Sequence, residues 1–121
     1  HSDEEIADAI LMLRDQIHTG LVGAMARVPV EGSPLCGYGA VDAQRLAAIT
    51  AVFILAMADR FDGVEVACSH PPHAEILRAG ASAVVVEVGA IPRDTAFAQR
   101  EWRGLTMAQA RRLLQDAGYE A

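Results

Sequence analysis

Residues 46–58 read LAAITAVFILAMA, thirteen consecutive positions without a charged side chain. A helix that is apolar all round must be covered on every side, so this stretch predicts a helix inside the fold. Thirteen residues are too few to cross a bilayer, which takes about 20. Asp42 is placed to cap the helix, and Asp59 and Arg60 return the chain to water. We therefore predict a buried central helix over residues 42–61, with the rest of the chain wrapped around it.

The composition describes a single acidic domain with an aliphatic core. A chain of 121 residues is long enough for one domain, residues 1–121, that buries a real core. Hydrophobic residues make up 52% and aromatic residues only 5%, so Ala, Val, Leu and Ile must form the interior. The net charge of −6 argues against duplex nucleic acid or an anionic membrane surface as the main partner, since both favour a basic protein.

Several enzyme classes are excluded by residues that the chain lacks. It contains no Lys and no Asn, so it has no Schiff-base lysine, no P-loop lysine and no Asn oxyanion donor. Its two cysteines are too few for a disulfide framework, and we therefore expect a reducing compartment, the cytoplasm. No targeting or membrane-spanning segment is visible, although a chain that begins His1-Ser2 leaves a removed targeting segment open.

Helices at both ends of the chain are predicted by their capping boxes. Ser2 with Glu5, and Thr106 with Gln109, have the S/T-x-x-E/Q spacing in which side chain and backbone cap each other. An apolar stripe at helical spacing follows each box. The stripes are Ile6, Ile10, Leu13 and Ile17 before Gly20, and Ala110, Leu113, Leu114 and Ala117 before Gly118.

Three segments have the pattern of strands. Residues 63–68 alternate apolar and polar positions, and residues 83–88, AVVVEV, are typical of a strand covered on both faces. A short helix over residues 73–79, ended by Gly80, joins them into a βαβ unit. Residues 21–30 are apolar and predict a further strand, with a continuation of the first helix as the alternative.

The fold class that follows is α/β. Right-handed crossovers would make successive strands parallel, which predicts a small, mainly parallel sheet of three strands or slightly more. We expect helices on both faces of this sheet around the central helix. The alternative is an α+β arrangement in which residues 21–30 are antiparallel or helical.

The carboxyl ends of the strands are where a site is expected. In open parallel sheets ligands bind beyond these ends, where the loops 31–40, 69–72 and 90–95 would meet. Most side chains capable of chemistry lie in or beside these loops.

A metal site is one hypothesis for this edge. Cys68, His70 and His73 form a C-x-H-x-x-H pattern, and thiolate and imidazole suit zinc or a related divalent metal. The spacing matches no zinc motif. The alternative is that Cys68 is a small core residue and that the histidines lie at the surface.

A reactive thiol is the second hypothesis. Cys36 precedes the central helix, and a thiol near a helix N-terminus is activated. His70 or His73 could then act as its base, while Gly37 and Gly39 would leave backbone amides free to bind an anionic cofactor group. The alternative is a flexible glycine-rich turn with a buried cysteine.

Two classes of function are compatible with these residues. The first is a small-molecule enzyme or ligand-binding protein that uses Cys36, Cys68, His70 and His73. In that protein Arg93, with Asp94 beside it, would clamp an anionic group. The second is a non-catalytic oligomeric or accessory subunit whose loops only pack; in that case Arg93 and Asp94 form a solvated pair.

We also expect a homo-oligomer. A three-stranded sheet leaves two edges to be paired or covered. Residues 90–104 contain Ile91, Phe97 and Trp102 between arginines, which are residue types enriched in interfaces. The first turn of the chain is acidic and its last third is basic, which could steer two copies together. The alternative is a monomer whose tail covers its own sheet edge.

Overall fold

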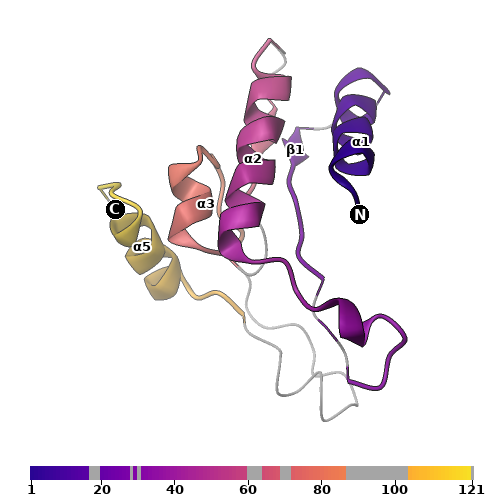
Figure 1. The fold of residues 1–121 in the computed structure, drawn as a ribbon. Coiled ribbons are helices and arrows are strands. Elements are labelled where there is room, and N and C mark those ends of the chain that lie inside the picture. Colours follow the sequence, from indigo (N-terminus) through magenta and orange to yellow (C-terminus); the bar gives the residue numbers. More distant parts are fainter. Residues whose placement is uncertain are drawn as a thin grey trace.

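The structure is a computed structural model, and it describes residues 1–16, 20–27, 29, 31–59, 64–68, 72–86 and 104–120. These residues form four helices, one 3-10 turn and a small parallel sheet. In chain order they are α1 Asp3–Gln16, β1 Leu21–Val22, η1 Cys36–Tyr38, α2 Ala43–Met57, β2 Glu65–Val66, α3 Ala74–Arg78 and α5 Met107–Asp116. Figure 1 shows α2 between α1 on one side and α3 and α5 on the other, so that α1 and α5 lie at opposite ends of the molecule.

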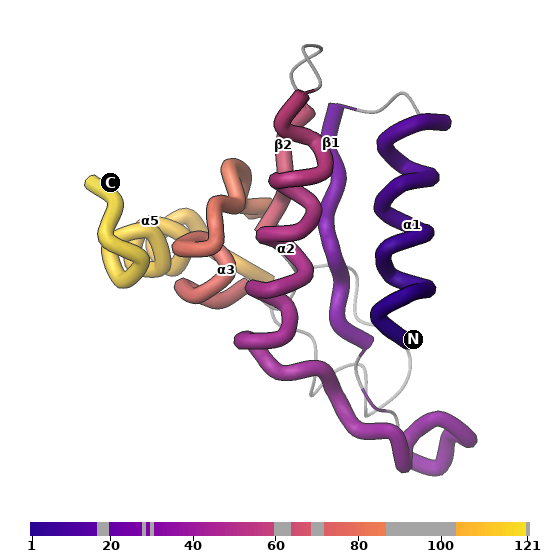
Figure 2. Tube along the Cα trace, turned by 45° about the horizontal axis from the view of Figure 1, so that its top comes forward, coloured from indigo at the N-terminus to yellow at the C-terminus, as the bar shows by residue number. Residues whose placement is uncertain are grey.

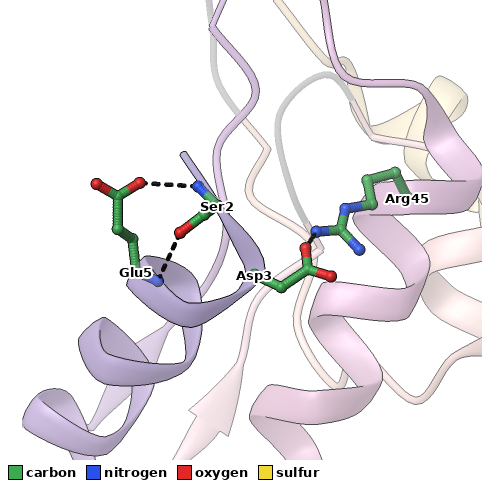
Figure 3. A network of polar contacts seen from close by, with 4 residues as sticks. All are labelled: Ser2, Asp3, Glu5 and Arg45. Carbon is green, nitrogen blue, oxygen red and sulfur yellow. Dashed lines mark hydrogen bonds and ion pairs between the residues drawn. The ribbon is translucent and has the colours of Figure 1, made fainter.

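Both capping boxes form as predicted. The amide of Glu5 donates to Ser2 Oγ at 3.2 Å, and the amide of Ser2 donates back to Glu5 Oε2 at 2.8 Å, as Figure 3 shows. Thr106 and Gln109 make the same reciprocal pair at the start of α5. Each box satisfies amides that have no partner within the helix, so the sequence alone fixes where α1 and α5 begin.

The central helix is α2, and it is buried on one side only. Its cap is the predicted one, because the Asp42 carboxylate accepts from the Arg45 amide at 2.7 Å. The buried residues are Leu46, Thr50, Phe53 and Met57. On the opposite side Val52 is 48% exposed and Leu55 is 76% exposed. The prediction of a helix buried on every side is therefore wrong. A lack of charge permits burial, but packing partners decide it.

At 15 residues α2 is the longest helix in the described part of the chain. Within these residues no helix is long and apolar enough to span a membrane. The predicted end of the central helix, at residues 60–61, lies outside the described residues.

The strands are parallel but shorter than predicted. β1 pairs with β2 in parallel, with Val22 opposite Val66, so an antiparallel or helical first strand is wrong. A third segment joins through a single parallel bridge between Ala67 and Ala83. The amide of Cys68 donates to the Ala83 carbonyl at 2.7 Å. The described sheet thus has two strands. Within residues 83–86 the predicted third strand forms only this bridge, and its last two residues, 87–88, lie outside the described part.

β2 lies in the middle of these segments. The amides of Glu65 and Ala67 bond toward β1, whereas Val66 and Cys68 bond toward residues 82–83. The three segments therefore follow one another across the sheet in chain order. Right-handed connections between parallel strands that advance in one direction place their helices, here α2 and α3, on the same face.

Burial in the strands agrees with this one-sided arrangement. Val22 and Val66 are buried against the helices, whereas Leu21 and Glu65, which point the other way, are exposed. The prediction of helices on both faces is therefore wrong for the part of the sheet that the structure describes. A second covered face would require the strand order to reverse direction, as it does in doubly wound folds.

Two hydrophobic clusters share α2. The first lies between α1, α2 and the strands and contains Ile10, Val22, Phe53, Met57 and Val66. The second lies between α2 and α3 and contains Leu46, Cys68, Ile76, Leu77 and Ala81. The predicted stripe of α5 packs on the second cluster, with Ala110 buried and Leu113, Leu114 and Ala117 partly buried.

The predicted short helix is α3. His73 is its N-cap residue, and Gly80 follows with φ of +109°. A Cβ at Gly80 would lie 2.8 Å from Ile54 Cδ1 on α2, so the turn combines a left-handed backbone with a close helix contact. Glycine meets both requirements.

Replacement of Thr50 by Val should stabilise the protein. Thr50 is fully buried on α2, and among the described residues its Oγ1 is the buried side-chain atom that has no hydrogen-bond partner. A buried unpaired hydroxyl is unfavourable, so the Val isostere should raise the free energy of unfolding by about 1 kcal/mol. Thr50→Ser keeps the hydroxyl but loses the methyl group, and should lower it by about 1 kcal/mol. Urea unfolding measures both, and a destabilised Thr50→Val would mean that Oγ1 is hydrogen-bonded after all.

Candidate functional site

The loop of residues 31–40 is the one of the three predicted site loops that lies wholly within the described residues. The chain that leaves β1 runs toward this loop, which then leads into α2, as Figure 1 and Figure 2 show. The loop is therefore at the carboxyl end of β1. η1, with Cys36 in it, therefore lies beyond the carboxyl end of β1, in a segment that projects away from the strands.

Three backbone amides of the loop, those of Cys36, Tyr38 and Gly39, are used in its own hydrogen bonds. The amide of Cys36 donates to the Ser33 carbonyl at 3.0 Å, and the amide of Gly39 donates to the Cys36 carbonyl at 3.2 Å. Gly39 has φ of +66°, which explains glycine at this position as a turn residue. The Gly39 amide is therefore used inside the turn and is not free for an anion, as the cofactor-binding hypothesis for Gly37 and Gly39 would require.

Arg27 was missed by the sequence analysis and holds this loop. Its guanidinium donates to the carbonyls of Leu35 at 2.8 Å and Gly39 at 2.9 Å, at the two ends of η1. The side chain thus ties the segment after β1 to the turn that precedes α2. The only signal in the sequence was that the loop is rich in glycine, which suggests exposed backbone carbonyls. This pattern does not specify which arginine binds them.

Cys36 is not at the N-terminus of α2. That position belongs to Asp42, whose carboxylate caps the helix, while Cys36 lies in η1 and is half-buried. The helix dipole is thus already satisfied by a carboxylate within the chain. The structure does not provide the activating position that the thiol hypothesis assumed.

Cys68 is a core residue, as the alternative interpretation had it. It is 7% exposed within the second hydrophobic cluster. Its Sγ donates to the backbone carbonyl of His73 at 3.8 Å. Burial raises the pKa of the Cys68 thiol above its usual value, which keeps it protonated at neutral pH. A metal ligand needs the thiolate, so burial opposes the role that the metal hypothesis gave to Cys68.

The other proposed site residues divide into two groups. His73 is half-buried at the start of α3 and comes near Cys68 through its backbone. His70, Arg93 and Asp94 lie outside the described residues. Within the described residues no three His, Cys, Asp or Glu side chains are grouped so that they could hold a metal. The site of Cys68, His70 and His73, and the anion clamp, therefore stay predictions.

The hollows among the described residues lie away from these side chains. A groove of about 530 Å³ runs between residues 80–86, α3 and α5, and its lining is mostly apolar, including Leu77, Val84 and Ala110. Arg111 and Tyr119 are its main polar lining, and the Tyr119 hydroxyl already donates to the Leu77 carbonyl at 3.2 Å. None of Cys36, Cys68 and His73 lines this groove or either of the two hollows beside α1.

The polar contacts that stand out join α1 to α2. Asp3 pairs with Arg45 at the first turns of both helices, as Figure 3 shows. Arg14 pairs with Asp59 at 2.6 Å at their opposite ends. These contacts connect residues more than forty positions apart, so no local sequence pattern could indicate them. Their role is to hold two helices side by side.

Comparisons of the chain with protein-family models, with curated proteins and with solved structures find no match.

Arg27→Ala should make Cys36 more reactive. Without its two hydrogen bonds to the loop carbonyls, the loop should open more often and expose the half-buried thiol. Two lost hydrogen bonds predict an alkylation rate about three to ten times higher. Arg112→Ala, at an exposed arginine of α5 with no ion pair among the described residues, is the matched control. Equal rates in both variants would show that Arg27 does not hold the loop.

The two thiols should also differ from each other, and the protein should bind no metal. In the folded protein Cys36 should react with an alkylating probe measurably but more slowly than a fully exposed thiol, while buried Cys68 should react only on unfolding. A chelator should leave the Tm unchanged, and metal analysis should find no stoichiometric zinc. One bound metal per chain, or a hyperreactive Cys36, would instead support the site predicted at the strand ends.

Proposed function

We propose that this chain is a non-catalytic accessory subunit that works by associating with another protein surface. The observation that supports the proposal is the parallel sheet, of which the described residues cover one face only. Parallel sheets occur almost always with both faces covered, since their residues are apolar on both sides. A sheet with one open apolar face is therefore suited to receive a second layer from a partner.

The open side is apolar on the two outer segments, and the exposed carboxylate of Glu65 in β2 lies between them. We define the apolar sheet face as Leu21, Met25, Ala67 and Val85. Leu21 is 48% exposed, Met25 is 80% exposed and Val85 is 52% exposed. Their neighbours Val22, Ala24 and Val84 point the other way and pack in the two clusters.

Close approach of the segments makes this face flat. Gly23 lies between Leu21 and Met25, and a Cβ placed on Gly23 would be 3.2 Å from Ala67 Cβ. Small residues at this crossing allow the backbones to approach without a protruding side chain. The face therefore combines exposed apolar side chains with one carboxylate, Glu65, and exposed apolar surface of this kind is one mark of a protein interface.

The competing small-molecule function receives less support from the described geometry. Cys36 lies in a self-bonded turn and Cys68 is a buried neutral thiol, and neither lines the groove beside α5 or the two hollows beside α1 that the described residues form. An enzyme site would need nucleophile and base within hydrogen-bond reach of each other. The association function requires no such grouping.

A matched pair of neighbouring substitutions tests whether the sheet face is open. Val85→Thr places a hydroxyl on the exposed side, and the free energy of unfolding should change by less than about 0.5 kcal/mol. Val84→Thr makes the same change on the side that packs against the second cluster, and should cost about 1 kcal/mol or more. Urea unfolding compares the two. Equal costs would mean that Val85 is packed within the chain, which would contradict the proposal.

A further inference from the structure

A second apolar surface lies on the outer side of α2. We define the α2 outer face as Ala48, Val52 and Leu55, which follow one another at spacings of four and three and are all exposed. Beside it α1 contributes Ala7 and Leu11, which is 47% exposed. A shallow hollow of about 200 Å³ between the helices is lined partly by Ala7, Ala48 and Val52.

The two helices present this surface as a fixed pair. Figure 2 shows α1 and α2 running side by side in the same direction. The ion pair of Asp3 with Arg45 holds their first turns, and that of Arg14 with Asp59 holds their last turns. A surface already ordered in the free chain loses little conformational entropy when a partner binds it.

The charges of α2 determine which partner and which direction fit. Between Arg45 and Asp59 the helix has no charged residue, and Val52 lies midway between these two. If a second copy packs antiparallel about Val52, the Arg45–Asp3 pair of each copy comes opposite the Asp59–Arg14 pair of the other, with Arg45 facing Asp59. Leu55 then lies against the small Ala48, and the two helix dipoles oppose each other. A parallel pairing would instead place Arg45 against Arg45 and Asp59 against Asp59 of the other copy, each beside its partner within the chain.

We infer that a second copy of this chain packs on the α2 outer face, antiparallel, with a two-fold axis at Val52. The contact is isologous, because the same surface serves both subunits and the assembly closes at two. With α1 and α2 from each copy, the interface is a four-helix arrangement. Burial of Val52 and Leu55 supplies most of the stabilisation. The exposed charges at the ends mainly select the direction.

This dimer gives the proposed association function one specific partner, a second copy of the chain. It uses the α2 outer face and not the apolar sheet face. The two proposals can therefore fail separately.

Light scattering on the full chain tests the dimer. The wild type should have twice the 12.9 kDa chain mass. Val52→Glu and Leu55→Glu should each halve it, since both place like charges in the interface. Tyr38→Glu, at a position of η1 that is 83% exposed, is the control and should leave the dimer intact. A mixture of Val52→Glu with Val52→Arg should restore the dimer, because the two-fold axis sets the two positions against each other.

Three results would overturn the inference. The first is a wild-type mass of 12.9 kDa at every concentration. The second is a dimer that Leu55→Glu and Val52→Glu both leave intact, with circular dichroism confirming that the variants are folded. The third is a dimer disrupted instead by Met25→Glu, which would leave the association function standing but assign it to the apolar sheet face. Failure of the Val52 mixture to restore the mass would exclude the two-fold axis at Val52.

Discussion

The structure depends on the packing of one face of α2. Leu46, at its first turns, enters the cluster with Ile76 and Leu77, while Phe53 and Met57 enter the cluster with Ile10 and Val22. This helix thus connects the two parts of the core, together with Ala24 after β1, which packs against both clusters. The stability of α1 and α3 depends on this helix because neither buries its apolar stripe against anything larger. α2 is also the crossover between β1 and β2, so the same contacts hold the parallel pair in register.

The one-sided sheet is a consequence of strand order. β1, β2 and the segment at Ala83 advance in one direction, and right-handed connections then place α2 and α3 on a common face. α1 joins the same side, since Ile10 packs with Phe53. The resulting protein has a helical layer with its own apolar exterior and a sheet with an apolar exterior. Both features follow from topology, and both are the surfaces on which the proposed association rests.

The chemistry suggested by the cysteines and histidines changes when burial is known. Cys68 lies one residue from a proline- and histidine-rich loop in sequence, yet its side chain belongs to the core and its burial raises its pKa. Cys36 lies before a helix, yet Asp42 occupies the helix N-terminus and Arg27 binds the loop carbonyls. In both cases a cysteine is capable of nucleophilic or metal-binding chemistry. Its surroundings, however, are those of a residue that serves packing or a turn.

Local interactions are what the sequence by itself determined. The capping boxes at Ser2 and Thr106, the Asp42 cap and the stop at Gly80 join residues within a few positions of each other, so their spacing is readable without a fold. Strand direction also followed, because βαβ connections are right-handed and parallel. Only the tertiary structure decided which sides of those elements are covered. The uncharged run of α2 is the same on every side in sequence, but Phe53 meets α1 and the strands while Leu55 meets solvent. Burial is a relation between distant segments, and no periodicity within one helix can specify it.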